Sequence, residues 1–73
     1  MMSAPVVPQW VDVYAIRDRC RLTQAQFAER IGVPVGTLRG WEQRRRMPEG
    51  PARVLLALLD QNPMIVEELL SRS

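Results

Sequence analysis

Residues 22–43 read LTQAQFAERIGVPVGTLRGWEQ, and this stretch decides the fold. Thr23 is a good N-cap, and Gln26 stands three residues later, as the capping box at a helix start requires. Gly32 ends this short helix where a left-handed backbone is needed. Pro34 fits the first turn of a second helix. The stretch therefore predicts two short helices joined by a tight turn that contains glycine, which is a helix-turn-helix unit.

The apolar residues of both helices recur at spacings that place them on one face. Ala28 falls where two crossing helices come closest, so a larger side chain there would push them apart. The second helix is expected over residues 34–43, with Leu38 and Trp41 facing inward. The other inward or flanking positions are Phe27, Ile31, Val33 and either Pro34 or Val35. We expect these side chains to hold the pair of helices against the rest of a core.

Helical spacing continues on both sides of this unit, and no strand pattern occurs. The predicted segments are an extended, poorly ordered arm over 1–8, a helix from Pro8 to about Arg21, a charged loop over 43–50, a helix from Pro51, and a helix from Met64 to about Ser71, opened by Asn62-Pro63. Their apolar stripes are Trp10, Val13, Ile16 (or Arg17) and Cys20; Val54, Leu55, Leu58 and Leu59; and Ile65, Val66, Leu69 and Leu70. The sequence predicts an all-α bundle of four to five short helices, with residues 9–73 as one domain.

The composition excludes several classes of function. The chain has 73 residues, no histidine and one cysteine. Neither a usual zinc site nor a disulfide framework can be built from that set, and the commonest general base is missing. Cys20 is expected to be a packed residue. No apolar run reaches the roughly 20 residues of a membrane span, and the first eight residues do not resemble a signal peptide. We expect a cytoplasmic protein that is not an enzyme, with no cofactor, metal, membrane contact or small-molecule substrate.

The charge is unevenly distributed. The net charge is +2, and all ten basic residues are arginines. Arginine pairs bidentately with phosphate and with guanine, although codon composition could produce the same bias. Residues 37–53 carry +3, whereas residues 54–73 carry −2. The second helix of a helix-turn-helix unit lies in the major groove of DNA, so arginines on and after that helix indicate phosphate contacts more than a solvated loop.

The run LTQAQFAERIGV, over residues 22–33, resembles the Cro/C1-type helix-turn-helix repressors. The following segments, TLRGWEQ over 37–43 and RRRMPEGPAR over 44–53, are similar to the antitoxin subgroup of that family, the regulators of toxin–antitoxin operons. The resemblance covers roughly residues 13–63. It implies a lambda-repressor-like DNA-binding domain and a cytoplasmic, nucleoid-associated protein.

The sequence departs from the family pattern in two places. Arg44 stands where members usually carry glycine, which adds a positive charge. Gly36 and Gly40 stand where members usually offer longer polar side chains to the bases, so either the helix backbone approaches DNA closely or the helix has lost specificity. The predicted base contacts are Val35, Gly36, Thr37, Arg39, Gly40 and Gln43, with Arg39 bidentate to guanine and Val35 against a thymine methyl. The predicted phosphate contacts are Gln24, at a helix N-terminus, and Arg44, Arg45, Arg46 and Arg53.

The last helix offers more apolar surface than one face needs, which indicates either a partner subunit or simple closure of the bundle. The arm with Trp10 is a second candidate surface. The resemblance implies a homodimeric repressor or autorepressor on a palindromic operator, with a possible toxin partner. The alternative is a protein-interaction module that neutralises a toxin and binds DNA weakly or nonspecifically. Within the domain, we expect Glu42 to pair with Arg30.

Overall fold

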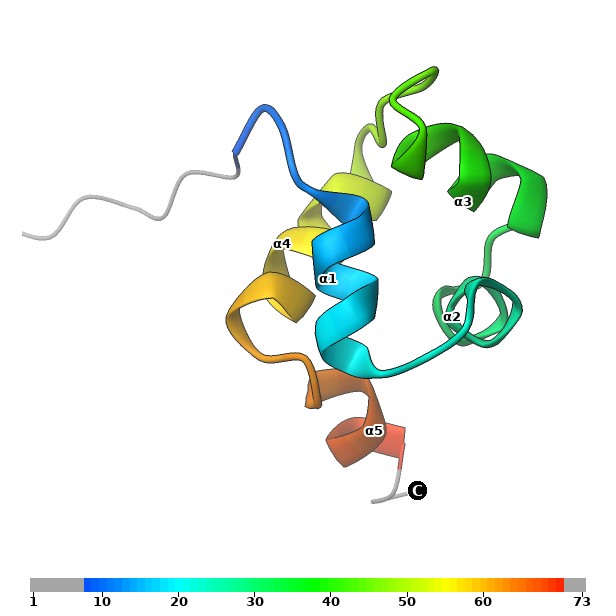
Figure 1. Ribbon diagram of the computed structural model, residues 1–73. Helices are drawn as coiled ribbons and strands as arrows, with labels where there is room; N and C mark the ends of the chain where they lie inside the picture. Colours follow the sequence, from blue (N-terminus) through cyan, green and yellow to red (C-terminus); the bar gives the residue numbers. More distant parts are fainter. Residues whose placement is uncertain (1–7, 71–73) are drawn as a thin grey trace, which may run out of the picture.

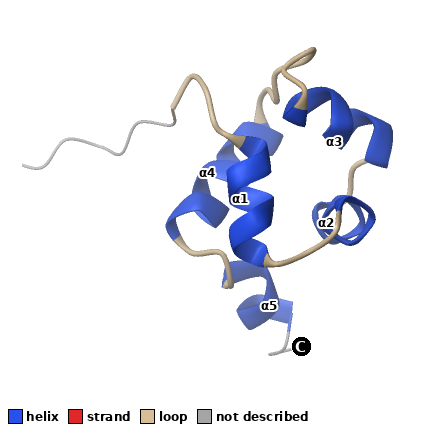
Figure 2. Ribbon diagram, in the orientation of Figure 1, coloured by secondary structure: helices blue, strands red, loops and turns tan. Residues whose placement is uncertain are grey.

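The computed structural model describes residues 8–70, whose backbone forms five α-helices and no strand (Figure 1). The helices are α1 (Val13–Cys20), α2 (Gln24–Ile31), α3 (Val35–Glu42), α4 (Pro51–Gln61) and α5 (Ile65–Leu70). Figure 2 shows that only loops connect them, which confirms the all-α prediction. The predicted arm lies outside the described residues except for Pro8, which is exposed, and so do the side chains of Val66, Leu69 and Leu70.

The helix-turn-helix unit forms as its capping pattern predicts. Thr23 Oγ1 accepts a hydrogen bond from the backbone N–H of Gln26 at 3.1 Å, and Gln26 Oε1 accepts one from the backbone N–H of Thr23 at 2.9 Å. Gly32 ends α2 with a φ of +78°, a conformation that glycine adopts without steric cost. Pro34 is the N-cap of α3 and so lies just outside the helix, not in its first turn. The predicted bounds of α3 are correct to within one residue at each end.

The first helix begins later than predicted. The carboxylate of Asp12 accepts a hydrogen bond from the backbone N–H of Ala15 at 3.0 Å and thereby caps the start of α1. The predicted start at Pro8 was therefore wrong, because the aspartate satisfies the free N–H groups that a helix start requires. Trp10 consequently precedes the helix and is 46% exposed, whereas Val11 is buried.

The core lies between the first four helices, where α1 packs against α3 and α4, and α2 packs against α3. Its fully enclosed large side chains are Ile16, Phe27, Leu38 and Leu56. The other buried apolar residues are Val11, Val13, Ala28, Trp41 and Leu59. The predicted inward positions of α2 and α3 are thus confirmed, with Ile31, Val33 and Val35 partly buried against the same core. This packing fixes α3 with its other face toward solvent.

The buried face of α4 differs from the prediction. Leu59 is buried and Leu55 packs partly against the core, as predicted. Leu56 is fully enclosed, however, whereas Val54 and Leu58 are 43% and 47% exposed. The stripe was misplaced because α4 is apolar on most of its sides, and periodicity then cannot tell which side faces the core. Two large apolar side chains therefore remain on the surface of α4, one turn apart.

The last helix begins close to its predicted position. The side-chain oxygen of Asn62 accepts a hydrogen bond from the backbone N–H of Met64 at 3.1 Å, and α5 starts at the next residue. Its predicted end at Ser71 lies outside the described residues. No helix in the part of the chain that the structure describes has the length and apolar character needed to cross a membrane.

Cys20 is packed at the end of α1, as predicted. Its Sγ donates to the backbone carbonyl of Pro63 at 3.6 Å. Burial raises the pKa of the thiol, which disfavours the reactive thiolate. Cys20 therefore links α1 to the start of the α5 region.

Candidate nucleic-acid interface

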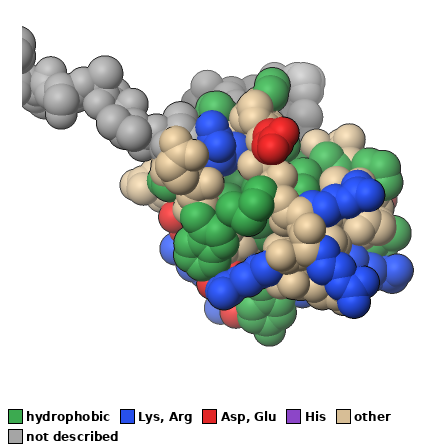
Figure 3. All heavy atoms as spheres, turned by 90° about the horizontal axis from the view of Figure 1, so that it is seen from above, with side chains coloured by type: hydrophobic (Ala, Val, Ile, Leu, Met, Phe, Trp, Pro, Cys, Tyr) green, Lys and Arg blue, Asp and Glu red, His purple; other side chains and the backbone are tan. Residues whose placement is uncertain are grey.

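The outward face of α3 and the loop after it line one broad, open hollow. The lining residues are Pro34, Gly36, Thr37, Arg39, Gly40, Gln43, Arg45 and Arg46, of which three are arginines and none is acidic. Figure 3 looks down on this end of the molecule and shows arginine side chains gathered over α3 and the loop. The structure thus brings together five of the six predicted base contacts and two of the predicted phosphate contacts.

The other four predicted contacts do not line this hollow. Val35 is half-buried against the core, so it offers less of its side chain to a base than the prediction assumed. Gln24 is half-buried at the start of α2. Arg53 is half-buried in α4, and its Nε is enclosed without a hydrogen-bond partner among the described residues. Arg44 is exposed, and its guanidinium carbon lies 4.9 Å from the ring centre of Trp10.

The two glycines of α3 occupy different surroundings. Among residues 8–70, a Cβ atom at Gly36 would meet nothing within 4 Å, so no described residue covers the helix backbone at this position. A Cβ atom at Gly40 would lie 3.4 Å from Cδ of Arg46. A side chain at position 40 would therefore contact the aliphatic part of Arg46, whereas one at position 36 would meet no described residue within 4 Å.

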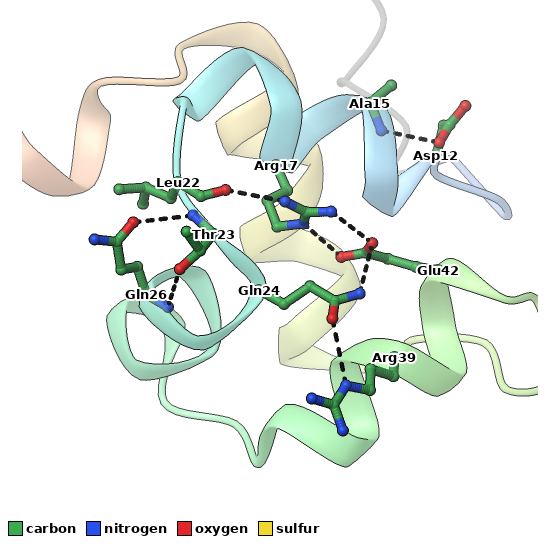
Figure 4. Close-up of polar contacts among 9 residues, drawn as sticks. All are labelled: Asp12, Ala15, Arg17, Leu22, Thr23, Gln24, Gln26, Arg39 and Glu42. Atoms are coloured by element: carbon green, nitrogen blue, oxygen red, sulfur yellow. Dashed lines mark hydrogen bonds and ion pairs between the residues drawn. The ribbon is translucent and has the colours of Figure 1, made fainter.

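A bidentate ion pair joins α1 to the end of α3 (Figure 4). Arg17 Nε and Nη2 donate to the carboxylate oxygens of Glu42 at 2.7 and 2.9 Å. Arg17 Nη1 also donates to the backbone carbonyl of Leu22 at 3.0 Å. The predicted pairing of Glu42 with Arg30 was wrong, since Arg30 pairs with Glu67 of α5. Local spacing could not indicate the true partner, because 25 residues separate Arg17 from Glu42.

Gln24 extends this ion pair to the exposed face of α3. Its Nε2 donates to Glu42 Oε1 at 3.2 Å, and its Oε1 accepts a hydrogen bond from Nε of Arg39 at 3.3 Å (Figure 4). Burial alone would raise the pKa of the Glu42 carboxyl, but hydrogen bonds from Arg17 and Gln24 hold it below its usual range. Three helices thus contribute to one polar chain, Arg17–Glu42–Gln24–Arg39, which ends at an exposed arginine.

A family model described as helix-turn-helix matches residues 13–52, which is more than half of the chain. The chain belongs to the helix-turn-helix family. Antitoxin HigA-2 of Vibrio cholerae serotype O1 (strain ATCC 39315 / El Tor Inaba N16961) is 33% identical to it over 52 residues, which cover 71% of this chain. The chain spans only 50% of that relative's length. No solved structure matches. The resemblance to the Cro/C1-type helix-turn-helix regulators is confirmed.

In this helix-turn-helix unit, the residue that follows the C-cap of α3 has a left-handed backbone although it is not a glycine. Arg44, which replaces the usual glycine, has a φ of +61°. Its backbone N–H donates to the carbonyl of Trp41 at 3.1 Å, and that of Arg45 donates to the carbonyl of Gly40 at 2.9 Å. These are the two hydrogen bonds of a Schellman motif. Arg44 therefore adopts a left-handed conformation of the kind that favours glycine, and it adds a charge beside the hollow.

Two residues that shape this helix-turn-helix surface were not predicted to do so. Arg17 holds the carboxylate of Glu42. The sequence contained one indication that Arg17 faces inward, because the apolar spacing of the first helix allowed either Ile16 or Arg17 at the inward position. A guanidinium turned toward a core needs a partner of opposite charge. Trp10 contacts Arg44 across 34 positions of the chain, and no local spacing could indicate that contact.

Proposed function

We propose that this chain is a sequence-specific transcriptional regulator that binds double-stranded DNA through α3 and the loop after it. The observation that supports this most is the distribution of unpaired arginines. Within residues 8–70, the three ion pairs use Arg17, Arg19 and Arg30, which belong to α1 and α2, while Arg21 and Arg53 form none. The arginines of α3 and its loop, which are Arg39, Arg44, Arg45 and Arg46, form no ion pair with any described residue. Unpaired cations around a hollow without acidic groups favour the phosphates of a nucleic acid.

The residues of the hollow fit complementary roles toward the bases. Arg39 has the fork of N–H donors that pairs with O6 and N7 of guanine. Thr37 and Gln43 offer hydrogen-bonding groups to neighbouring base edges, and Gly36 allows the helix backbone to approach the groove. The exposed part of Val35 would contact a thymine methyl.

The phosphate contacts would lie on both sides of the DNA major groove that holds α3. Gln24 begins α2, where free backbone N–H groups favour an anion. Arg44, Arg45 and Arg46 follow α3 and would contact the DNA backbone beyond the helix. Arg53 completes the predicted set from the first turns of α4. Together these contacts would fix the orientation of α3 on the duplex, and the base contacts would supply the specificity.

The regulator would act as a homodimeric repressor of antitoxin type on a palindromic operator, at the nucleoid in the cytoplasm. Two copies related by a two-fold axis place two α3 helices on successive half-sites. The exposed Val54 and Leu58 of α4 and the exposed Trp10 offer apolar surface for a second subunit. The same surfaces support the second candidate function, a module that neutralises a toxin, which the antitoxin name of the relative favours.

A salt titration of binding to duplex DNA tests the proposed function. For each phosphate neutralised, the slope of log affinity against log salt should steepen by about 0.9, so the wild type should show a slope of about −3 or steeper. Arg45→Ala should make the slope shallower by about one unit, because it removes one phosphate contact. Arg19→Ala removes the same charge from α1 and should leave the slope unchanged. An affinity that ignores salt would reject the DNA-binding proposal in favour of the protein-interaction module.

A further inference from the structure

We propose that Gln24 is a positioning residue that orients Arg39 toward a guanine and thereby sets the base-pair preference of the helix-turn-helix unit. This inference rests on the proposed function, because it takes Arg39 as a base contact. It goes beyond a phosphate-binding role for Gln24. A phosphate contact changes affinity for all sequences alike, whereas a positioning contact changes the choice among them.

The hydrogen bond to Gln24 leaves the guanidinium of Arg39 in a form that suits guanine. Arginine carries five N–H donors, of which one is on Nε. Gln24 Oε1 accepts the hydrogen bond from Nε, at 3.3 Å. The donors that remain are those on Nη1 and Nη2, and this pair matches O6 and N7 on the major-groove edge of guanine. An exposed arginine held at Nε has fewer orientations available, so less ordering is needed when it meets its base.

Glu42 determines which way the amide of Gln24 faces. An ionised carboxylate only accepts hydrogen bonds, so the amide must direct its NH₂ group toward Glu42. Nε2 of Gln24 does donate to Glu42 Oε1, at 3.2 Å. The opposite orientation would place the amide oxygen against the carboxylate and the NH₂ group against Arg39, which are two repulsive contacts. The Glu42 carboxylate is itself held by two hydrogen bonds from Arg17, at 2.7 and 2.9 Å. The amide oxygen therefore faces Arg39, because only this orientation avoids both repulsive contacts.

The test is a double-mutant cycle read out as base-pair preference. The full chain first selects duplexes from a random library. The affinities for the selected duplex and its single-base-pair variants are then measured for the wild type, Gln24→Met, Arg39→Ala and the double variant. Arg39→Ala should lower the preference for one G·C pair by about tenfold, which is within the contribution of a bidentate contact. Gln24→Met should lower the same preference by about threefold, comparable to the cost of immobilising one flexible side chain. In the Arg39→Ala background, Gln24→Met should have no further effect on it.

Two further variants separate positioning from folding and from phosphate binding. Gln26→Met makes the same substitution in the same helix and removes a capping hydrogen bond without touching Arg39, so it should keep the preference. Gln24→Glu keeps an acceptor for Nε of Arg39 but adds a negative charge beside Glu42. It should weaken binding to every duplex and still prefer the same G·C pair. Thermal unfolding confirms that each variant is folded at the temperature of the binding assay, and Gln24→Ala replaces Gln24→Met if the latter is not.

The inference is overturned if Gln24→Met weakens binding to all four base pairs equally, or if it changes the preference equally with and without Arg39. In both cases the wild type would still select a sequence, so the proposed function would stand. A wild-type chain that selects no sequence at all would instead reject the proposed function, and the inference with it.

Discussion

At the scale of single residues, Arg44 combines an unfavourable backbone with a useful charge. Its φ of +61° lies in the left-handed region, which costs a side-chain-bearing residue roughly 1 kcal/mol relative to glycine. The guanidinium stacks over Trp10 at 4.9 Å and recovers part of that cost. Strained residues of this kind cluster where function requires a particular side chain, and here the side chain lies beside the candidate interface.

Arg44→Gly should therefore raise stability and weaken DNA binding. We expect the free energy of unfolding to rise by up to about 1 kcal/mol, measured by urea denaturation. Arg21→Gly is the matched control, because Arg21 also ends a helix in the left-handed region, with a φ of +59°. It should give a similar stabilisation with unchanged affinity for duplex DNA. Equal losses of affinity in both variants would show that only net charge matters.

Glu42 should make the stability of the fold sensitive to acid. A carboxyl whose pKa is lowered in the folded state stabilises the protein above its unfolded-state pKa, and that contribution is lost as the pH falls through the folded-state value. At neutral pH, Glu42→Gln should cost about 3 kcal/mol, because it leaves the charge of Arg17 uncompensated. The cost should shrink below the ordinary glutamate pKa of 4.5. Urea denaturation at neutral pH and near pH 3 measures both values.

The control for that prediction is Glu49→Gln, which changes a carboxylate in the exposed loop that forms no ion pair with the described residues. Its stability should track that of the wild type at both pH values. A difference between Glu42→Gln and wild type that stays constant with pH would show that the Glu42 carboxylate does not gain its stabilisation from being ionised.

At the scale of elements, the packing of the described residues does not require a glycine at position 36 of α3. Gly36→Ala should raise the free energy of unfolding by about 0.5 kcal/mol, since a Cβ there meets no neighbour. Its affinity for duplex DNA should fall, because the methyl group would project into the groove. Gly40→Ala should stabilise the fold to a similar extent, because its Cβ would only come into van der Waals contact with the exposed side chain of Arg46, at 3.4 Å. If Gly36→Ala gains stability and binds DNA as well as the wild type, the backbone does not approach DNA at this position.

Among the helices, the features set by neighbouring residues could be predicted from the sequence, and those set by tertiary packing could not. The capping box of Thr23 and Gln26 and the turn at Gly32 were predictable because capping acts within a few residues along the chain. The buried face of α4 was not, because Leu56 and Leu58 are equally apolar and only tertiary packing distinguishes them. The partner of Glu42 lies on another helix, so the polar chain could not be derived from spacing. The arginines of α3 and its loop could be predicted as a basic surface, but the hydrogen bond between Gln24 and Arg39 could not.

At the scale of the whole molecule, the charge is unevenly distributed along the sequence, and the ion pairs decide where it remains uncompensated. Residues 37–53 carry +3 and residues 54–73 carry −2. Asp60 of α4 pairs with Arg19, and Glu67 of α5 pairs with an arginine of α2. These two acidic side chains thus neutralise arginines of the first two helices, whereas Arg39 of α3 and the arginines of its loop form no ion pair with a described residue. In Figure 1, α3 lies at the upper right and α5 at the bottom of the view. The unpaired positive charge of α3 and its loop would turn this side of the molecule toward a duplex.

The most direct test of this account is an NMR titration of the ¹⁵N-labelled chain with a duplex that it selects. We expect the largest amide shifts on Gln24 and on residues 35–46, which are α3 and its loop, with small shifts over α5. When salt is added, the amide signals of residues 35–46 should return to the chemical shifts of the free protein, because phosphate contacts weaken with ionic strength. Large shifts confined to α4 and α5, with α3 unchanged, would contradict the account.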